Sequence, residues 1–521
     1  DQVVETSILD VAAGNQSRGH RFHAPEAITI DNAGEYQQAL LNAKVVADFE
    51  TRQTQVKDAV EKTAASLGGQ ARIDSGLLEE VSALVEWPVP ISGGFEDKFM
   101  AMPPEVITTT IEDHQKYFPV EDKDGNLLPH FITLSNLESS APEEIQKGNE
   151  RVVKPRLEDA LFFWEQDKKE PLISRLEKLQ TVVFQKELGT LAEKTERVAS
   201  LGVELAKACN GNAKNVEIAA KLSRCDLLTH AVYEMPELQG RMGYYYALND
   251  GHSTEIAEAI EGLYQPRFAG DDLPSNLTGS LLSLADKLDT LAGIFAIGKK
   301  PTGDKDPFAL RRAAIGVLRL CQELPLTINL EEWLAKAVAA QPVNAKADEI
   351  TADLVTFISE RARVLAKDQG IDGRAFSAVL EVAPLNPADI QTRAQAVNDF
   401  MQSDAAASLS EANKRAGNIL RKQEASEGSL DIDAGLLSES AEQALQTALQ
   451  NTLPQVEAAV VKQAYAEALN ALTALAQPLD QFFTDVMVMA EDEAVRNNRL
   501  ALLRNIRKAL SSVADISLLQ S

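Results

Sequence analysis

The sequence predicts a multidomain, predominantly α-helical protein with an α/β region at its N-terminus. The length of 521 residues corresponds to three or four domains at roughly 150 residues each. Apolar residues make up 45% and aromatic residues only 5%, with alanine and leucine abundant. This balance favours helices packed on helices.

The first 165 residues are expected to form the α/β region. Two β-rich segments, PVPISGGF (88–95) and HFITLSNL (130–137), are separated by turns such as Asp124-Gly125-Asn126. A long polar helix is expected from about Tyr36 to Leu67, before Gly68-Gly69.

The rest of the chain is expected to be helical in three parts: a domain over 166–325, a linker over 326–395 and a domain over 396–521. Within the first, residues 281–297 read as a buried helix, 298–308 as a loop and 308–321 as an amphipathic helix. The acidic stretch 424–433 is expected to be a loop in the last domain.

Charge and cysteine content restrict the functional classes. With 51 Lys and Arg against 78 Asp and Glu, the net charge is −27, which argues against a general nucleic-acid coat protein but not against local basic surfaces. Three scattered cysteines offer no zinc motif and fit a reducing cytoplasm. No apolar run is long enough for a membrane span. The first residues, DQVVETSILD, resemble neither a signal peptide nor a chain start, so we expect a piece of a longer protein.

Catalytic motifs are sparse. Neither GxSxG nor HExxH occurs. The segment GIFAIGKK (293–300) approaches the phosphate-binding loop GxxxxGK[ST], but Lys300 stands where the hydroxyl is needed, and a core helix ending at Gly298 is the better interpretation.

Three local basic clusters are candidate RNA-phosphate contacts, with ordinary solvated faces as the alternative. At about 100° per residue, the basic residues of the C-terminal helix gather opposite an apolar face, with Arg499 at the border. The clusters are Lys299, Lys300, Lys305, Arg311, Arg312 and Arg319; Lys414, Arg415, Arg421 and Lys422; and Arg496, Arg499, Arg504, Arg507 and Lys508.

Histidines contribute little. Alternation on a strand would place His20 and His23 on one face, where they could bind metal, but polar surface is the simpler interpretation. His114 lies in a polar cluster that could line a pocket.

Several long segments resemble the β subunit of bacterial glycyl-tRNA synthetase, in family order across the chain. They include RCDLLTHAVYEMPELQGRMGYYYAL (224–248), LADKLDTLAGIFAIGKKPTGDKDPFALRRAA (284–314), GNERVVKPRLEDALFFWEQD (148–167) and FFTDVMVMAEDEAVRNNRLALLRNI (482–506). The resemblance implies a cytoplasmic α2β2 ligase. Its α subunit would use ATP, Mg and glycine, and its β subunit would bind glycine tRNA, with no catalytic residue, metal or cofactor of its own and no DNA or membrane partner.

Three parts of the chain carry further resemblances. The helices of 166–325 look like an HD domain, but Cys225 stands where the histidine of the His-Asp pair should be. Asp226 and Asp286 match the two aspartates, and the expected earlier helix, within 181–200, contains no histidine. This implies a degenerate site. The C-terminal part resembles the anticodon-binding (DALR-like) domain of arginyl-tRNA synthetase, where Asn497, Asn498, Arg496 and Arg499 could read bases and Phe482 and Phe483 are expected in the core. The N-terminal region resembles the B3/B4 region of phenylalanyl-tRNA synthetase, which could edit, bind tRNA or scaffold.

Two alternatives stay open at this point. One is an HD-type metal-dependent phosphohydrolase, motivated by Asp226 and Asp286. The other is a purely structural assembly subunit, allowed by the acidic surface and the Ala/Leu-rich helices.

Overall fold

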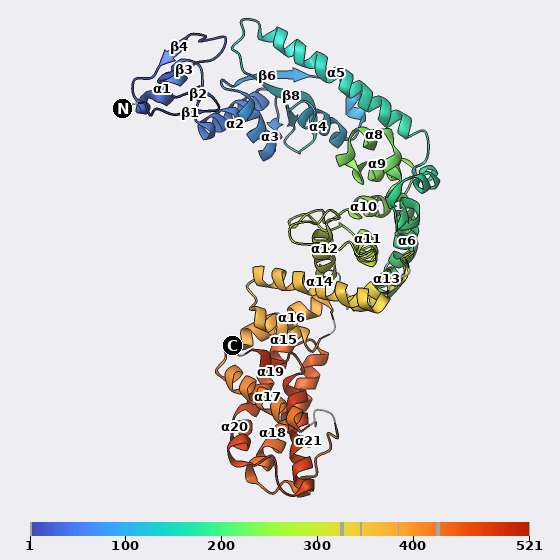
Figure 1. Cartoon of the computed structure of the whole chain (residues 1–521). Coiled ribbons are helices and arrows are strands. Elements are labelled where there is room, and N and C mark those ends of the chain that lie inside the picture. Colours follow the sequence, from blue (N-terminus) through green and yellow to red (C-terminus); the bar gives the residue numbers. More distant parts are fainter. Residues whose placement is uncertain (1–2, 324–327, 344–345, 384, 424–427, 520–521) are drawn as a thin grey trace. The chain divides into compact units, whose positions relative to one another are not determined.

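A computed structural model describes residues 3–323, 328–343, 346–383, 385–423 and 428–519 (Figure 1). Its contacts divide the chain into two compact units. The N-terminal unit comprises Asp1–Ser174 and Asp226–Asp250, and the helical unit comprises Arg175–Cys225 and Gly251–Ser521. Residues 226–250, expected in the first helical domain, therefore pack with the N-terminal unit. The other predicted boundaries stay predictions.

The N-terminal unit is α/β, as predicted. Its elements are β1 (Ser7–Ile8), β2 (Val11–Ala12), β3 (Gln16–Arg18), β4 (Ala27–Thr29), α1 (Tyr36–Asn42), α2 (Phe49–Ser66), β5 (Gln70–Ala71), α3 (Ser75–Leu84), β6 (Val89–Gly94), α4 (Pro104–Glu112), β7 (Phe118–Glu121), β8 (Leu127–Ser135), α5 (Pro142–Asp167), α8 (His230–Glu234) and α9 (Arg241–Asn249). Strands β5-β7-β8-β6 form an antiparallel sheet. The predicted strands are β6 and β8, and the predicted turn joins β7 to β8 with Gly125 at φ +82°.

Helices cover both faces of this sheet. On one face, Val56 and Val60 of α2 and Val81 of α3 form a core with Phe118 and Ile132 of the strands. On the other, α5 packs along β6 (Figure 1). There the Tyr117 hydroxyl donates to Asn149 Oδ1 of α5 at 2.6 Å, and the Gly94 N–H donates to Glu150 Oε1 at 3.0 Å.

The expected single helix over 36–67 is wrong, because two helices with a break occupy this stretch. Lys44 has φ +61°, which ends α1. The Val46 N–H donates to the Glu86 carbonyl at 2.9 Å, so this segment pairs outside any helix. Asp48 then caps α2 by accepting from the Thr51 N–H at 2.8 Å. The break between α1 and α2 is therefore fixed by the contact with Glu86, 40 residues further along the chain, and local periodicity cannot predict it.

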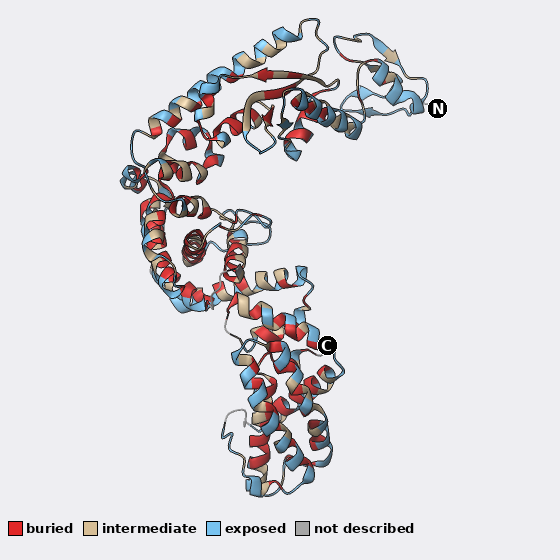
Figure 2. Ribbon diagram, turned by 180° about the vertical axis from the view of Figure 1, so that it is seen from behind, coloured by how far each residue is buried: buried red, intermediate tan, exposed pale blue. Residues whose placement is uncertain are grey.

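The helical unit surrounds one buried helix. Its elements are β9 (Val183–Gln185), β10 (Gly189–Thr190), α6 (Leu191–Ala208), α7 (Ala213–Leu222), α10 (Thr254–Gly262), α11 (Leu277–Ala296), α12 (Leu310–Glu323), α13 (Leu330–Ala339), α14 (Ala347–Asp368), α15 (Gly373–Leu380), α16 (Pro387–Phe400), α17 (Asp404–Lys422), α18 (Ser440–Val461), α19 (Tyr465–Leu472), α20 (Ala476–Asp485) and α21 (Glu493–Leu510). Helix α11 is buried along most of its length and is packed by α6, α7, α10, α12, α13 and α14 (Figure 2). The predicted helix–loop–helix over 281–321 is confirmed, and residues 428–433 form the predicted loop while 424–427 lie outside the described residues.

The segment 293–300 is a helix terminus and not a phosphate loop. Gly298 has φ +71° just beyond α11. The Lys299 N–H donates to the Ile294 carbonyl at 3.1 Å and the Gly298 N–H to the Phe295 carbonyl at 2.9 Å, the bonding pattern of a glycine-terminated helix. Gly293 is packed against Gln341 and Leu188, so its backbone faces protein.

Replacing Gly93 by alanine should destabilise the sheet. A Cβ at Gly93 of β6 would lie 2.3 Å from the ring of Phe131, its cross-strand partner, and that ring is fully buried and stacked on Tyr117. We expect a loss of about 2 kcal/mol in the free energy of unfolding, measured in urea. Gly148→Ala on the exposed face of α5, where a Cβ meets nothing within 4 Å, is the control and should be neutral or stabilising. Equal stability of the two variants would contradict the tight contact.

Candidate nucleic-acid interface

The carboxylates expected to mark a degenerate HD site are bound to protein groups. Asp286 of α11 contacts Lys194 of α6 at 3.1 Å and also pairs with Arg224. One turn on, Asp289 contacts Lys194 at 3.0 Å and Arg197 at 2.7 Å. Burial alone would raise the pKa of Asp286, but the nearby cations Lys194, Arg224 and Lys287 outweigh it and lower that pKa to about 2. Cations from neighbouring helices thus surround the carboxylates that a metal would need.

Asp226 is buried and bonded to backbone. Its Oδ2 accepts from the Gly240 N–H at 2.5 Å and the Gly243 N–H at 3.1 Å, which ties the short 3-10 helix Cys225–Leu228 to the start of α9. Burial raises its pKa to about 6. Cys225 is buried and donates to the Lys221 carbonyl. Nowhere in the described chain do three His, Cys, Asp or Glu side chains gather as metal ligands. These residues do not fit a di-metal centre, so the phosphohydrolase alternative is not favoured.

The loop between α11 and α12 and the first turn of α12 present two exposed cations without carboxylate partners. Lys299 lies 3.7 Å from Glu187, Lys300 pairs with Asp353, and Arg311 donates to the Gly303 carbonyl. Lys305 and Arg312 are exposed and form no ion pair with any described residue. Asp306 accepts from the Leu310 and Arg311 N–H groups, which fixes the start of α12 and so the direction in which Arg312 emerges.

The second and third basic clusters lie on helices that pack against each other. The Arg507 guanidinium of α21 sits over Gly417 of α17, where an added Cβ would meet it at 2.3 Å. Lys414 of α17 and Lys508 of α21 are exposed and form no ion pair within the described segments. Chain folding therefore brings together two clusters that are about 80 residues apart in the sequence.

The other cations of these clusters are partly buried or already bonded to protein groups, so they are less available to bind phosphate. Arg421 is exposed and bonded to Asn418, Arg496 donates to the Ala490 carbonyl at 3.1 Å, and Arg507 lies 3.8 Å from Asp515. Arg415 is exposed, but it lies over the Phe483 ring and donates to the Phe483 carbonyl. Arg319 is partly buried on α12.

Three residues that the sequence analysis proposed as RNA contacts are instead bonded within the protein. They are Arg499, Asn498 and Arg504. Arg499 is 5% exposed, pairs with Glu442 of α18 and donates to the Met487 carbonyl, so its prediction as a tRNA contact is wrong. Asn498 exchanges two hydrogen bonds with the Asp433 backbone, at 2.8 and 3.0 Å. Arg504 donates to the Ser429 carbonyl at 2.9 Å, and burial lowers its pKa. Both hold the 428–433 loop. Phe482 and Phe483 are in the core, as predicted.

The predicted histidine pair is not polar surface. His20 is buried; its ring accepts from the Phe22 and His23 N–H groups and bonds to the Asn136 carbonyl at 2.5 Å. His23 accepts from the Glu138 N–H at 3.0 Å. Neither residue is in a strand, and both hold the N-terminal segment to the β8 end. His114 is exposed beyond α4.

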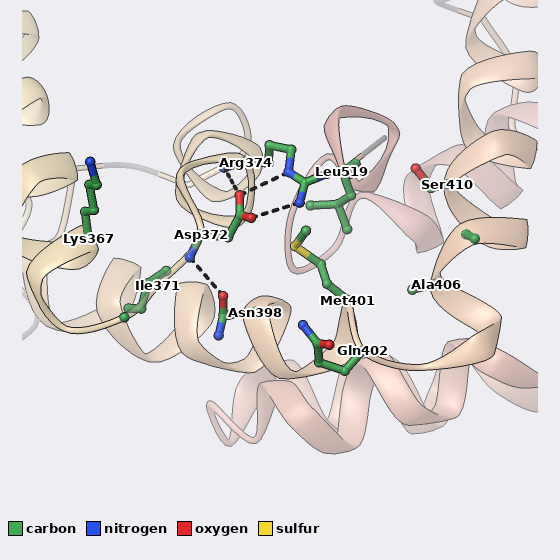
Figure 3. Close-up of a pocket in the computed structure, with 12 residues that line it drawn as sticks. Lys367, Ile371, Asp372, Arg374, Asn398, Met401, Gln402, Ala406, Ser410 and Leu519 are labelled. Atoms are coloured by element: carbon green, nitrogen blue, oxygen red, sulfur yellow. Dashed lines mark hydrogen bonds and ion pairs between the residues drawn. The ribbon is translucent and has the colours of Figure 1, made fainter. Parts of the chain in front are cut away.

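A cavity of about 940 Å³ in the helical unit was missed by sequence analysis (Figure 3). It joins the end of α14, the starts of α15 and α17, the end of α16 and the C-terminal turn around Leu519. Its lining residues run from Lys367 to Leu519, and none of them was singled out by the sequence analysis. No local pattern could have indicated it.

Removing the charge of Asp286 should destabilise the helical unit. In Asp286→Asn, Arg224 and Lys194 stay buried with one counter-charge fewer, and we expect a loss of about 3 kcal/mol in the free energy of unfolding in urea. Asp272→Asn, at an exposed position, is the matched control and should change stability by less than about 0.5 kcal/mol. Unchanged stability in Asp286→Asn, or a gain of bound metal by the wild type on dialysis against Mn²⁺, would contradict this description.

Asp226 should make stability fall as pH rises. Its folded-state pKa of about 6 lies above the ordinary 3.8, so the native state binds the proton more tightly than the unfolded state. The stability from this group is present below pH 4 and is lost as pH rises through 6, about 3 kcal/mol in total. The free energy of unfolding of the wild type and of Asp226→Asn, measured by denaturation from pH 4 to 7.5, tests this. The wild type should lose stability relative to Asp226→Asn as pH rises. A constant difference in stability between the two proteins would contradict the raised pKa of Asp226.

Comparison with known proteins agrees with this geometry. A family model described as "Glycyl-tRNA synthetase beta subunit" matches residues 1–381, and one described as "DALR anticodon binding domain" matches residues 409–517. The "Glycine--tRNA ligase beta subunit" of Acinetobacter baumannii (strain ACICU) is 48% identical over 521 residues, which is 100% of this chain and 75% of the relative. That of Pseudomonas aeruginosa (strain LESB58) is 47% identical over 519 residues, 100% of this chain and 76% of the relative. No described helix is both long and apolar enough to cross a membrane. The chain belongs to the glycyl-tRNA synthetase β subunit family and ends in a DALR anticodon-binding domain.

Proposed function

We propose that this chain binds glycine tRNA through the helical unit and positions it for a separate α subunit, which uses ATP and Mg²⁺ to attach glycine. The complex would be a cytoplasmic α2β2 heterotetramer, and this chain would bind no cofactor. The family and the anticodon-binding domain support the tRNA role of the β subunit.

The observation that carries the proposal is the set of exposed cations without carboxylate partners on a chain of net charge −27. Lys305, Arg312, Lys414 and Lys508 all belong to the helical unit. Most other lysines and arginines of the three clusters are held by carboxylates or carbonyls. A cation that has no internal partner can neutralise a phosphate without breaking an existing bond.

The assignment of chemistry to another polypeptide has separate support. The near-miss phosphate loop is a helix terminus packed against Gln341 and Leu188. The aspartates of the HD-like site are held by Lys194, Arg224 and the backbone. Neither place offers the free N–H groups or the metal ligands that phosphoryl chemistry requires.

Charge reversal tests this proposal. We expect Lys305→Glu/Arg312→Glu and Lys414→Glu/Lys508→Glu each to weaken tRNA binding at least about tenfold at low salt and to reduce the slope of log affinity against log salt by about two. In a mixture reconstituted with the α subunit, tRNA charging should fall accordingly. Glycine-dependent exchange of pyrophosphate into ATP, which needs no tRNA, should be unchanged.

The control is Lys62→Glu/Lys123→Glu, which makes the same charge change at exposed positions of the N-terminal unit. If all three double variants charged tRNA like the wild type, the chain would serve assembly only. If exchange activity fell together with charging, the reversed residues would act on the chemistry, and the division of labour proposed here would be wrong.

A further inference from the structure

An exposed aromatic patch lies where the end of α5 meets α8 in the N-terminal unit (Figure 1). Its members are Phe162, Phe163, His230 and Tyr233. Phe162 is 58% exposed, Tyr233 is 80% exposed, and the His230 side chain is 66% exposed. The Phe163 and His230 rings are parallel, with centroids 6.0 Å apart, so the two helices share one surface. Single exposed apolar residues are ordinary, but aromatic rings gathered on one surface mark a place where another molecule binds.

The buried Asp167 at the end of α5 holds part of this patch in place. Its Oδ1 accepts from the His230 N–H at 3.0 Å and lies 2.9 Å from His230 Nδ1. Its Oδ2 accepts from the Ala231 N–H and from the Tyr246 hydroxyl, both at 3.0 Å. The His230 ring is therefore fixed, and its Nε2 has no hydrogen-bond partner among the described residues. A contact surface that is ordered before binding loses little side-chain entropy when a partner arrives.

The core of the unit gives no reason for aromatic rings at the two most exposed positions. The buried side of α5 includes Val153, Leu157 and Trp164. At about 100° per residue, Phe162 lies on the opposite side of that helix. On α8 the buried residues directly precede Tyr233, which itself is outside the core. A polar side chain at either position would leave the packing unchanged, so the rings serve a contact outside the unit.

Free carboxylates lie beside the α8 part of the patch. Glu234 and Glu237 are exposed and form no ion pair within the described segments. Residues 227–240 contain no lysine or arginine that could neutralise them. Such carboxylates repel the phosphates of RNA and attract cations.

The cations at the end of α5 are bonded or distant. Lys168 pairs with Glu165 at 2.7 Å, and Lys169 is bonded to the Gln166 amide at 2.9 Å. Arg156 is exposed but lies about two turns before the patch on α5. The patch therefore combines aromatic faces with free negative charge, which is the chemistry that receives an arginine or lysine side chain. These observations favour a protein partner over RNA.

We propose that the aromatic patch is a docking surface for the α subunit. Arginine or lysine side chains of that subunit pack on Tyr233 and His230 and pair with Glu234 and Glu237. The inference rests on the proposed function, which supplies the α subunit as the protein partner. It assigns the contact between subunits to the N-terminal unit and leaves the exposed cations of the helical unit for tRNA.

Two double variants test the patch in the full chain. Phe162→Ser/Tyr233→Ser removes the two most exposed rings, and Glu234→Gln/Glu237→Gln removes the charges while keeping the size of the side chains. Affinity for the purified α subunit is measured at low and high salt, and affinity for glycine tRNA is measured in parallel. Amide hydrogen exchange of the wild type, with and without the α subunit, needs no variant and reports on the same surface.

The matched control is Phe22→Ser/Tyr36→Ser, which makes the same chemical change at aromatic residues of the N-terminal unit that are 71% and 45% exposed.

Phe162→Ser/Tyr233→Ser should lower the affinity for the α subunit at least about tenfold, because exposed aromatic anchors carry much of the binding energy of an interface. Glu234→Gln/Glu237→Gln should lower it about threefold at low salt and make it less dependent on salt. The control variant should change it no more than about twofold, and all three should bind tRNA like the wild type. In the wild type, the α subunit should slow exchange at residues 230–237.

The outcomes separate this inference from the proposed function. If Phe162→Ser/Tyr233→Ser bound the α subunit like the control variant, the inference would be wrong while the proposed function stood. If that variant lost affinity for tRNA and kept its affinity for the α subunit, the patch would be an RNA surface, and the inference would again be wrong. If the wild type bound no α subunit, the proposed division between two subunits would fail, and this inference with it.

Discussion

Two ion-paired aspartates on α11, the buried Asp289 and the partly buried Asp286, connect the helices of the helical unit. Asp289 is 2% exposed and is bonded by Lys194, Arg197 and Gln341, while Asp286 is bonded by Lys194 and Arg224. An unpaired charge in such a place costs several kcal/mol, so the helices that supply these partners have to be in position together. The network therefore joins α6, the end of α7 and the α13 end to α11. Helix α11 in turn fixes where the basic loop and α12 begin.

The same network accounts for carboxylates in the helical core without a metal ion. Lysine and arginine neutralise the carboxylates as a metal would, and so the core keeps its charge balance. They cannot lower the pKa of a bound water or polarise a phosphoryl oxygen through an open coordination position. Asp226, held by two backbone N–H groups, is likewise part of the fold. What such an arrangement can still provide is a rigid support for surface residues.

Sequence patterns predicted what depends on local spacing and missed what depends on distant contacts. Local spacing was enough to predict α11, the glycine beyond its end and the apolar face of α21. The burial of Arg499 could not be predicted in this way, because Arg499 lies at the edge of that face and is held by Glu442, 57 residues earlier in the chain. The break between α1 and α2 likewise depends on Glu86. The cavity at Asn398 needs residues from 367 to 519, each unremarkable alone.

The charge balance of the chain bears on how such a protein would select RNA. A net charge of −27 repels polyanions, so a few cations without internal partners can hold RNA only where its phosphates meet them in register. This arrangement disfavours nonspecific binding but carries no base information.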